Sequence, residues 1–279
     1  MLVSREEMTY DFEGASFDLE RDRGVLGWIF SQFLYGEVTG VQVGHWLERA
    51  PDFEAAQFLA RQANEEMAHV KVFLRILSSL GQQPQPPNRV LKFLVTDFAG
   101  ATFTEHCFVE MALGEGFVLG AIYALVDTLP ESDIRTMLKG LARQEEGHVS
   151  FGEEQTIKAL RRDPAQARHL LGLALVSMAG VGKLAGYARA RFADHPVLSQ
   201  LPGFLAHTRK VTELRLHRMG VARNGTLPAM KPADRGMLIA ASVARRYGRA
   251  LNPLRQRPRS LTGTYLRDPS IRERLRSGE

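Results

Sequence analysis

The chain has 279 residues, of which 44% are hydrophobic and 24% are charged, the ordinary balance of a soluble globular protein. Its single cysteine, Cys107, excludes an intrachain disulfide and agrees with a reducing compartment. Residues 1–14 are acidic and lack the apolar core of a secretory signal, so we expect a cytoplasmic protein. No uninterrupted apolar run reaches the roughly 18 residues of a membrane span, and we expect the nearest, 170–182, to be a buried helix.

Charge is distributed unevenly along the chain. The net charge is +5, but from Met219 onward 13 Lys and Arg stand against 4 Asp and Glu, so the first 218 residues carry a net −4. A basic end indicates an anionic partner, such as an acidic protein, a lipid surface or RNA; a solvated tail is the simpler alternative. We divide the chain into a helical bundle with extra packing helices, 1–222, and a basic helix and tail, 223–279.

Apolar periodicity and helix-breaking residues predict an all-α fold, an antiparallel four-helix bundle with additional C-terminal helices. Asp18 is a candidate cap for the first helix, Pro51 suits the first turn of the second, and Gly81 ends the second. The predicted helices, in chain order, span 18–49, 51–80, 90–98, 101–125, 131–162, 164–192, 196–219 and 233–250.

Two copies of one short motif organise the bundle. Glu66-x-x-His69 lies in the second helix and Glu145-x-x-His148 in the fifth. Residues three apart share a helix face, so each pair can bind one metal ion. One such motif is a weak signal, but two motifs, each preceded by a helix with one inward glutamate, are typical of a carboxylate-bridged two-metal site.

The inward glutamates are predicted from stripe position and spacing. Glu37 lies on the apolar stripe of the first helix, and Glu115 on that of the third long helix. Glu37 precedes Glu66 by 29 residues and Glu115 precedes Glu145 by 30, which places all four at one height in two antiparallel hairpins. Glu110 is a rival for Glu115; five residues of α-helix turn it to another face, although an asymmetric loop would tolerate its spacing.

Four carboxylates and two histidines form an oxygen-rich ligand set that suits iron, or a mixed manganese–iron pair, better than structural zinc. We expect Glu66 and Glu145 to bridge or flank the two ions, and Glu37 and Glu115 to be terminal. Glu65 and Gln144 are candidate acceptors for the outer ring nitrogens of the histidines. Tyr35 and Tyr123 are candidate supporting phenols. The candidate apolar lining is Phe33, Phe73, Phe108, Met111 and Leu119.

These six residues make the chain resemble the ferritin-like di-metal carboxylate superfamily over about residues 18–162. Within it, the short spacings and the run 145–153 are similar to aldehyde-deformylating oxygenases. The resemblance implies a di-iron centre that uses dioxygen, an external electron donor of the ferredoxin or reductase type, and a small organic or acyl-type substrate. The residues immediately before the motif Glu and the motif His are Glu65 and Ala68 in the first motif, and Gln144 and Gly147 in the second. Many multicomponent monooxygenases of the superfamily have Asp and Arg at these two positions.

Other functions remain open at this point. A hydroxylase acting on tRNA or on a carrier protein would give the basic end a role. An iron-handling or peroxide-scavenging protein would need no organic substrate, and a homodimer is compatible with either. Glu213 and His217 form a further Glu/His pair on one helix, which we interpret as a solvated pair because charge is dense over 210–218.

Overall fold

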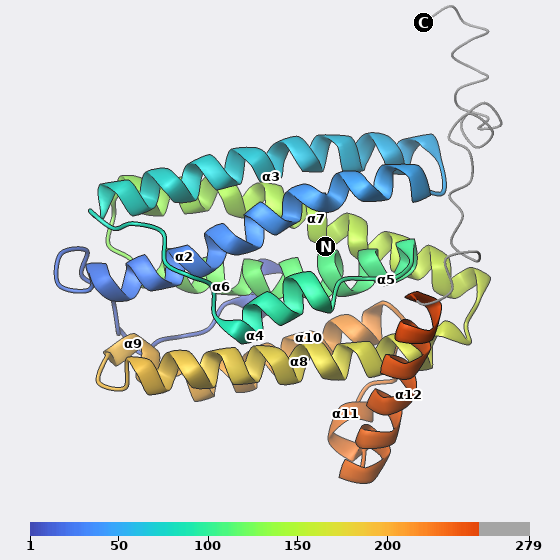
Figure 1. Cartoon of the computed structure of the whole chain (residues 1–279). Helices are drawn as coiled ribbons and strands as arrows, with labels where there is room; N and C mark the ends of the chain where they lie inside the picture. The colour runs from blue at the N-terminus through green and yellow to red at the C-terminus, as the bar shows by residue number, and fades with distance from the viewer. Residues whose placement is uncertain (251–279) are drawn as a thin grey trace, which may run out of the picture.

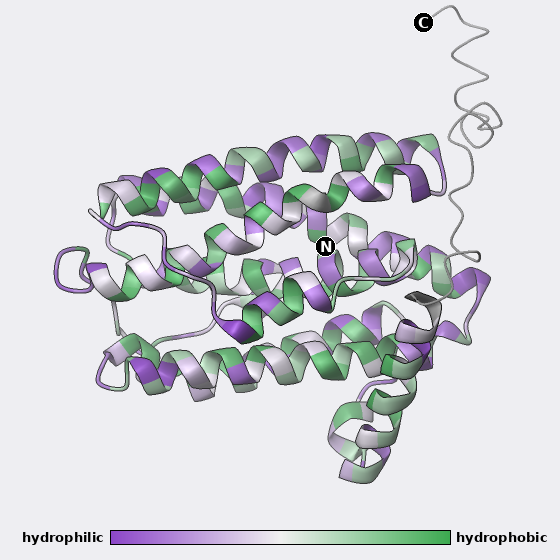
Figure 2. Ribbon diagram, viewed as in Figure 1, coloured by the Kyte–Doolittle hydropathy of each residue, from purple (hydrophilic) through white to green (hydrophobic). Residues whose placement is uncertain are grey.

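The computed structural model describes residues 1–250, and over this range every regular element is a helix, which confirms the predicted all-α class. Most of the long helices lie roughly along one common direction, the C-terminal helix Pro232–Ala250 runs across it, and shorter helices connect or cover them (Figure 1). Figure 2 shows hydrophilic and hydrophobic residues alternating along α3 and α7, as expected for helices with one buried face. The basic end beyond residue 250 lies outside the described residues.

The first hairpin is made by α2 (Arg23–Gly40) and α3 (Phe53–Ser79), which pack against each other. Between them, η1 (Val41–Arg49) is a 3-10 helix, the tighter form often found where an α-helix ends. The prediction of one helix over 18–49 was therefore wrong at its start, which is Arg23; its end at Arg49 agrees, although the last nine residues are a 3-10 helix. Asp18 does not cap α2, because its carboxylate accepts from the amides of Glu20 and Arg21 in the preceding turn.

The second hairpin joins a composite helix to α7 (Asp133–Arg162). The composite helix comprises α5 (Phe103–His106), the π-helical η3 (Cys107–Glu115) and α6 (Gly116–Thr128). A π segment bonds i to i+5 and changes the register of the residues that follow it. The sequence predicted a single α-helix here, so the premise used to separate Glu110 from Glu115 by rotation was wrong. Their observed positions are described below.

Other helices connect the hairpins or cover one side of them. Helix α8 packs on η3, α10 and α12, and α1 packs on α10. Their bounds are α1 Arg5–Met8, α4 Arg89–Lys92, π-helical η2 Phe93–Asp97, α8 Gln166–Arg191, α9 Pro196–Ser199, α10 Leu201–Arg218, α11 Thr226–Ala229 and α12 Pro232–Ala250.

Capping residues set the ends of the two motif helices. Asp52 accepts a hydrogen bond from the amide of Ala55 at the start of α3, and Ser132 accepts from the amide of Arg135 at the start of α7. Helix α3 ends at Ser79 and is followed, after Leu80, by Gly81, whose φ of 64° lies in the left-handed region where glycine is favoured. Both helices therefore run unbroken through their Glu-x-x-His motifs.

A glycine sets how closely α7 approaches η3. A Cβ added to Gly152 would lie 2.6 Å from the carbonyl oxygen of Cys107 and 2.7 Å from the amide nitrogen of Ala112, closer than real Cβ contacts. Gly147, also on α7, is exposed and has nothing within 4 Å of an added Cβ. Of these two glycines of α7, only Gly152 is therefore required for the close contact with η3.

A buried ion pair connects α10, one of the helices that cover the hairpins, to α7. Arg215 of α10 donates from Nε to Glu153 Oε1 at 2.9 Å, and both side chains are about 99% buried. The amide of Leu2 donates to the other carboxylate oxygen at 2.6 Å. The expectation of a solvated Glu213 and His217 pair agrees with His217, which is exposed, but Glu213 is half-buried and Arg215 between them is buried.

Two helical stretches, Phe103–Thr128 and Gln166–Arg191, have an average hydropathy and length that would suffice to cross a membrane. The first carries Glu105, Glu110 and Glu115, and 61% of its most apolar window is buried inside the protein. Core helices of soluble proteins pass the same criterion, so these stretches are weak evidence for a membrane span.

Candidate metal centre

The six predicted ligand residues come together inside the protein from four helical segments. Glu37 comes from α2, Glu66 and His69 from α3, Glu115 from the end of η3, and Glu145 and His148 from α7. Their donor atoms form two groups that could each hold a metal ion, one around His69 and one around His148. The grouping of these residues agrees with the predicted set.

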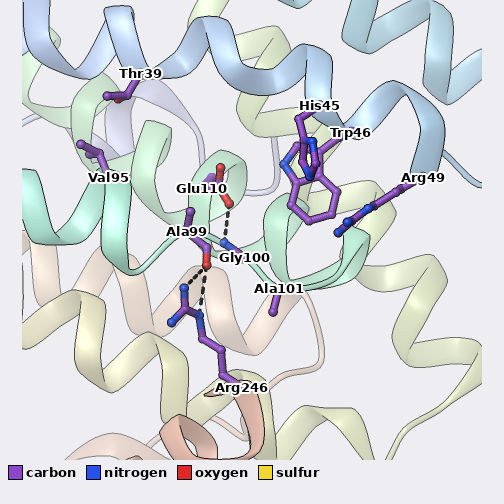
Figure 3. A pocket seen from close by; sticks show the side chains of 10 residues that line it. All are labelled: Thr39, His45, Trp46, Arg49, Val95, Ala99, Gly100, Ala101, Glu110 and Arg246. Carbon is purple, nitrogen blue, oxygen red and sulfur yellow. Dashed lines mark hydrogen bonds between the residues drawn. The ribbon is translucent and has the colours of Figure 1, made fainter. Parts of the chain in front are cut away.

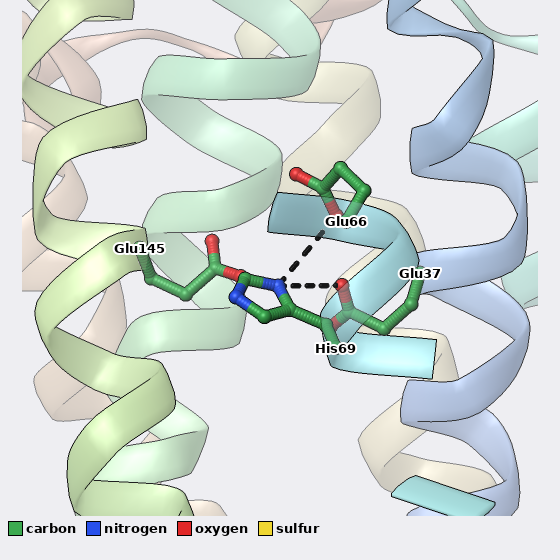
Figure 4. A group of neighbouring side chains, drawn as sticks. All are labelled: Glu37, Glu66, His69 and Glu145. Carbon is green, nitrogen blue, oxygen red and sulfur yellow. Dashed lines mark hydrogen bonds and ion pairs between the residues drawn. The ribbon is translucent and has the colours of Figure 1, made fainter. Parts of the chain in front are cut away.

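The first group surrounds Nδ1 of His69. This nitrogen lies 3.1 Å from Glu37 Oε2, 3.1 Å from Glu145 Oε1 and 3.8 Å from Glu66 Oε2. Figure 4 shows the His69 ring between Glu37 on α2 and Glu145 on α7. Glu66 reaches the ring from α3, the helix that also carries His69. All four side chains are buried. Three carboxylates and one nitrogen therefore surround a single point.

The second group surrounds Nδ1 of His148. This nitrogen lies 3.3 Å from Glu66 Oε1, 3.5 Å from Glu145 Oε2 and 3.8 Å from Glu115 Oε2. The Glu115 side chain keeps 20% of its surface exposed, unlike the other carboxylates of the centre. The two imidazole centroids are 6.0 Å apart.

Glu66 belongs to both groups, and Glu145, a member of the first group, also has one oxygen 3.5 Å from Nδ1 of His148. In each carboxylate one oxygen faces Nδ1 of His69 and the other faces Nδ1 of His148. Glu37 faces only His69, and Glu115 faces only His148. The division into two bridging and two terminal carboxylates stays a prediction, because it concerns bound metal ions.

Glu65 and Gln144 accept from the outer ring nitrogens, crosswise between the motifs. Nε2 of His148 lies 2.8 Å from Glu65 Oε2, and Nε2 of His69 lies 2.9 Å from Gln144 Oε1. With an acceptor at Nε2, a neutral ring keeps its proton there, so that loss of the second proton would leave Nδ1 free to bind a metal ion. The residue before each motif glutamate thus accepts a hydrogen bond from the histidine of the other motif.

Gln62 is a further member of the site that the sequence reasoning did not single out. Its amide nitrogen donates to Glu115 Oε1 at 2.9 Å and approaches Glu66 Oε1 at 3.4 Å. The signal was present, because Gln62 is a polar residue on the apolar stripe of α3, one turn before Glu66. Its role needed the position of Glu115, 53 residues away.

The donor set fits a pair of cations. Glu115 Oε2, Glu145 Oε2 and His148 Nδ1 are buried and have no hydrogen-bond partner among the described residues. Buried polar atoms of this kind are costly unless they find a partner, and metal ions would provide one. A Cβ at Gly40 would lie 2.8 Å from Glu66 Oε2, so glycine leaves room for that carboxylate.

Without metal, protons must supply the positive charge of the cluster. Burial raises the pKa of Glu37 and of Glu115 well above the ordinary value. Burial alone would lower the pKa of His148, but the nearby carboxylates of Glu145 and Glu66 raise it to about 12. The pKa of His69 is raised by its carboxylate partners in the same way, again against the effect of burial. Metal binding therefore competes with protons.

Glu110, the rival ligand, lies elsewhere. It accepts from the amide of Gly100 at 2.6 Å, lies 2.9 Å from His106 Nδ1, and lines a cavity of about 330 Å³ (Figure 3). The full lining is Thr39, His45, Trp46, Arg49, Val95, Ala99, Gly100, Ala101, Glu110 and Arg246. Glu115 thus lies in a group that could hold a metal ion, and Glu110 belongs to the cavity wall.

The predicted apolar lining is part of the packed core and does not line this cavity. The buried members fall in different clusters, and Phe33 stacks on Phe73 at 5.4 Å. The residues concerned are Phe33, Phe73, Phe108, Met111 and Leu119. Prediction from stripe position could not separate core from cavity, because both face inward.

The two tyrosines make no hydrogen bond to the six residues within the described part of the chain. Tyr123 donates to Glu146 Oε1 at 2.5 Å, and Tyr35 is half-buried on α2. Burial and the Glu146 carboxylate raise the pKa of Tyr123. Its contact with the centre is at most indirect, through the residue that follows Glu145.

Comparison with known proteins adds no family assignment to this geometry: no family model, no curated protein and no solved structure matches the chain.

Proposed function

We propose that the protein is a di-iron, dioxygen-dependent oxidoreductase built on a ferritin-like antiparallel four-helix bundle. The bundle would consist of α2, α3, the η3–α6 helix and α7. One observation carries the proposal: Glu66 and Glu145 each direct one oxygen to each histidine Nδ1. Two bridging carboxylates, two terminal carboxylates and two imidazoles would hold two ions and leave positions open for oxygen and water.

When bound, two iron ions would supply the ability to reduce dioxygen with electrons from an external donor and to oxidise an organic molecule. The chain's own residues would position the ions, and the crosswise acceptors Glu65 and Gln144 would hold the rings with Nδ1 inward. The packed apolar residues around the centre would exclude bulk water.

The first test is anaerobic titration with ferrous iron, comparing the wild-type protein with Glu66→Ala and Glu145→Ala. We expect two iron ions per chain, an optical change on adding oxygen, and loss of both ions in each variant, because each removes a shared ligand. Glu154→Ala is the matched control: Glu154 lies on α7, is exposed, and its ion pair within residues 1–250 is with Lys158 four residues on.

Iron stoichiometry near zero in a folded wild-type protein would refute the metal centre. Two ions that react with oxygen in the absence of any oxidised product, across a screen of acyl and apolar substrates, would favour an iron- or peroxide-handling protein. Substrate oxidation coupled to oxygen consumption would support the oxidoreductase.

A further inference from the structure

We propose that the two metal positions have unequal affinities, with the ion between His148 and Glu115 bound more tightly than the ion between His69 and Glu37. This inference rests on the proposed function and adds to it the residues that make the positions unequal. Those residues surround the ligands and differ between the two halves of the centre.

The outer hydrogen bonds differ in charge and hardly in length. His148 Nε2 lies 2.8 Å from the carboxylate of Glu65, whereas His69 Nε2 lies 2.9 Å from the amide oxygen of Gln144. A carboxylate acceptor makes the imidazole a stronger metal ligand than a neutral acceptor does, because it stabilises positive charge on the ring. His148 is therefore the stronger of the two nitrogen donors.

The distribution of negative charge also favours tighter binding at the His148 position. Glu66 and Glu145 are shared, and each position has one terminal glutamate, so the carboxylate of Glu65 is an extra negative charge beside His148. Arg61 lies 3.8 Å from Glu65, but its side chain is 63% exposed, and solvent screens such a pair. Gln144 contributes no charge beside His69.

The ligands at the His148 position are also better fixed before metal arrives. Gln62 holds Glu115 by a hydrogen bond of 2.9 Å. The corresponding position on α7, four residues before Glu145, is the apolar Leu141, and Glu37 has no amide donor among the described residues. A ligand already held in place loses less freedom on binding.

Stepwise binding of Co²⁺ to the full-length protein, measured by visible absorption against a competing chelator under anaerobic conditions, tests the inference. We expect two resolved steps in the wild-type protein. His148→Ala should remove the tighter step, and His69→Ala the weaker one. Glu65→Gln should weaken the tighter step by about 10- to 100-fold, the usual effect of losing an outer partner, and spare the weaker step.

The exchange variant, Glu65→Gln with Gln144→Glu, conserves the total charge and provides the sharpest test. In it we expect the order of filling to reverse, so that adding His69→Ala now removes the tighter step. Glu154→Gln makes the same chemical change on the exposed surface of α7 and should leave both steps unaltered. Circular dichroism and Tm of each metal-free variant check that it folds.

Equal affinities in the wild-type protein, or an unchanged tighter step in Glu65→Gln, would overturn the inference while leaving the two-metal centre intact. A tighter step that survives in His148→Ala would do the same. A wild-type protein that binds no Co²⁺ would overturn the proposed function together with the inference. The two failures are thus distinguishable in one titration series.

Discussion

At the scale of single residues, the carboxylates that could bind metal ions lower the stability of the metal-free protein. Four carboxylates face one small buried volume, and their mutual repulsion must be offset by protons or by metal. Residues that hold the ions therefore destabilise the metal-free fold.

Glu37→Gln separates these two effects. The amide keeps the shape of the side chain and a contact with His69 but removes one buried carboxyl whose pKa burial raises. We expect the metal-free protein to gain about 0.5–2 kcal/mol in its free energy of unfolding and the affinity at the His69 position to fall. Denaturant unfolding in a chelator and metal titration measure the two changes. A loss of stability without metal would contradict this account.

The pH dependence of the metal-free protein follows from the same groups. His148 has its pKa raised from 6.5 to about 12, so its contribution to stability is complete below about pH 6.5 and is lost as pH rises toward 12. Glu37 and Glu115, with raised pKa values, are favoured neutral and oppose folding once ionised. Between about pH 6 and pH 9 we expect the Tm of chelator-treated protein to fall.

Metal should have the opposite effect over that range. Binding releases the protons, so the increase in Tm on adding metal should grow with pH. Differential scanning calorimetry with and without metal gives both trends. A metal-induced shift that shrinks as pH rises would exclude proton competition at the site.

The sequence alone was sufficient for the residues that share a helix with their partners. Glu66 and His69, three apart on one stripe, could be paired by counting. Gln62 and Arg215 could not be assigned roles, because their partners Glu115 and Glu153 come from other helices. A polar residue on an apolar stripe marks such a position without naming its partner.

At the scale of elements, helix existence and order followed from periodicity, but helix type did not. The π segment η3 and the 3-10 segment η1 have the composition of ordinary helix, and their hydrogen bonds depend on packing against α7 and α3. The height argument still located Glu115 correctly, because it counted residues from the chain turn rather than degrees around a helix.

Two glycines of α7 provide a matched test of helix packing. Gly152→Ala would place its methyl group against backbone atoms of η3, which cannot move independently of their helix. We expect a loss of about 1–3 kcal/mol in the free energy of unfolding. Gly147→Ala, at an open position of the same helix, should gain about 0.5–1 kcal/mol. Equal effects of the two substitutions in urea denaturation would show that α7 does not closely contact η3.

At the scale of the whole molecule, one buried pair joins three distant parts of the chain. Arg215 on α10, Glu153 on α7 and the amide of Leu2 meet where solvent is excluded. Arg215→Met leaves the carboxylate without its charged partner and should cost about 3–5 kcal/mol of unfolding free energy. Adding Glu153→Gln should restore part of that loss. Thermal unfolding of the two variants measures this recovery. If the double variant is no more stable than the single one, the loss of stability comes from packing rather than from the unpaired charge.

The crosswise support of the two histidines has a consequence for fragments of the protein. The α2–α3 hairpin contains His69 but takes its acceptor, Gln144, from α7, and α7 contains His148 but takes Glu65 from α3. A cleavage within 81–100 would give two halves, each with one Glu-x-x-His motif and neither with a supported ring. Capture of metal by mixed halves, but by neither half alone, would then report their reassociation.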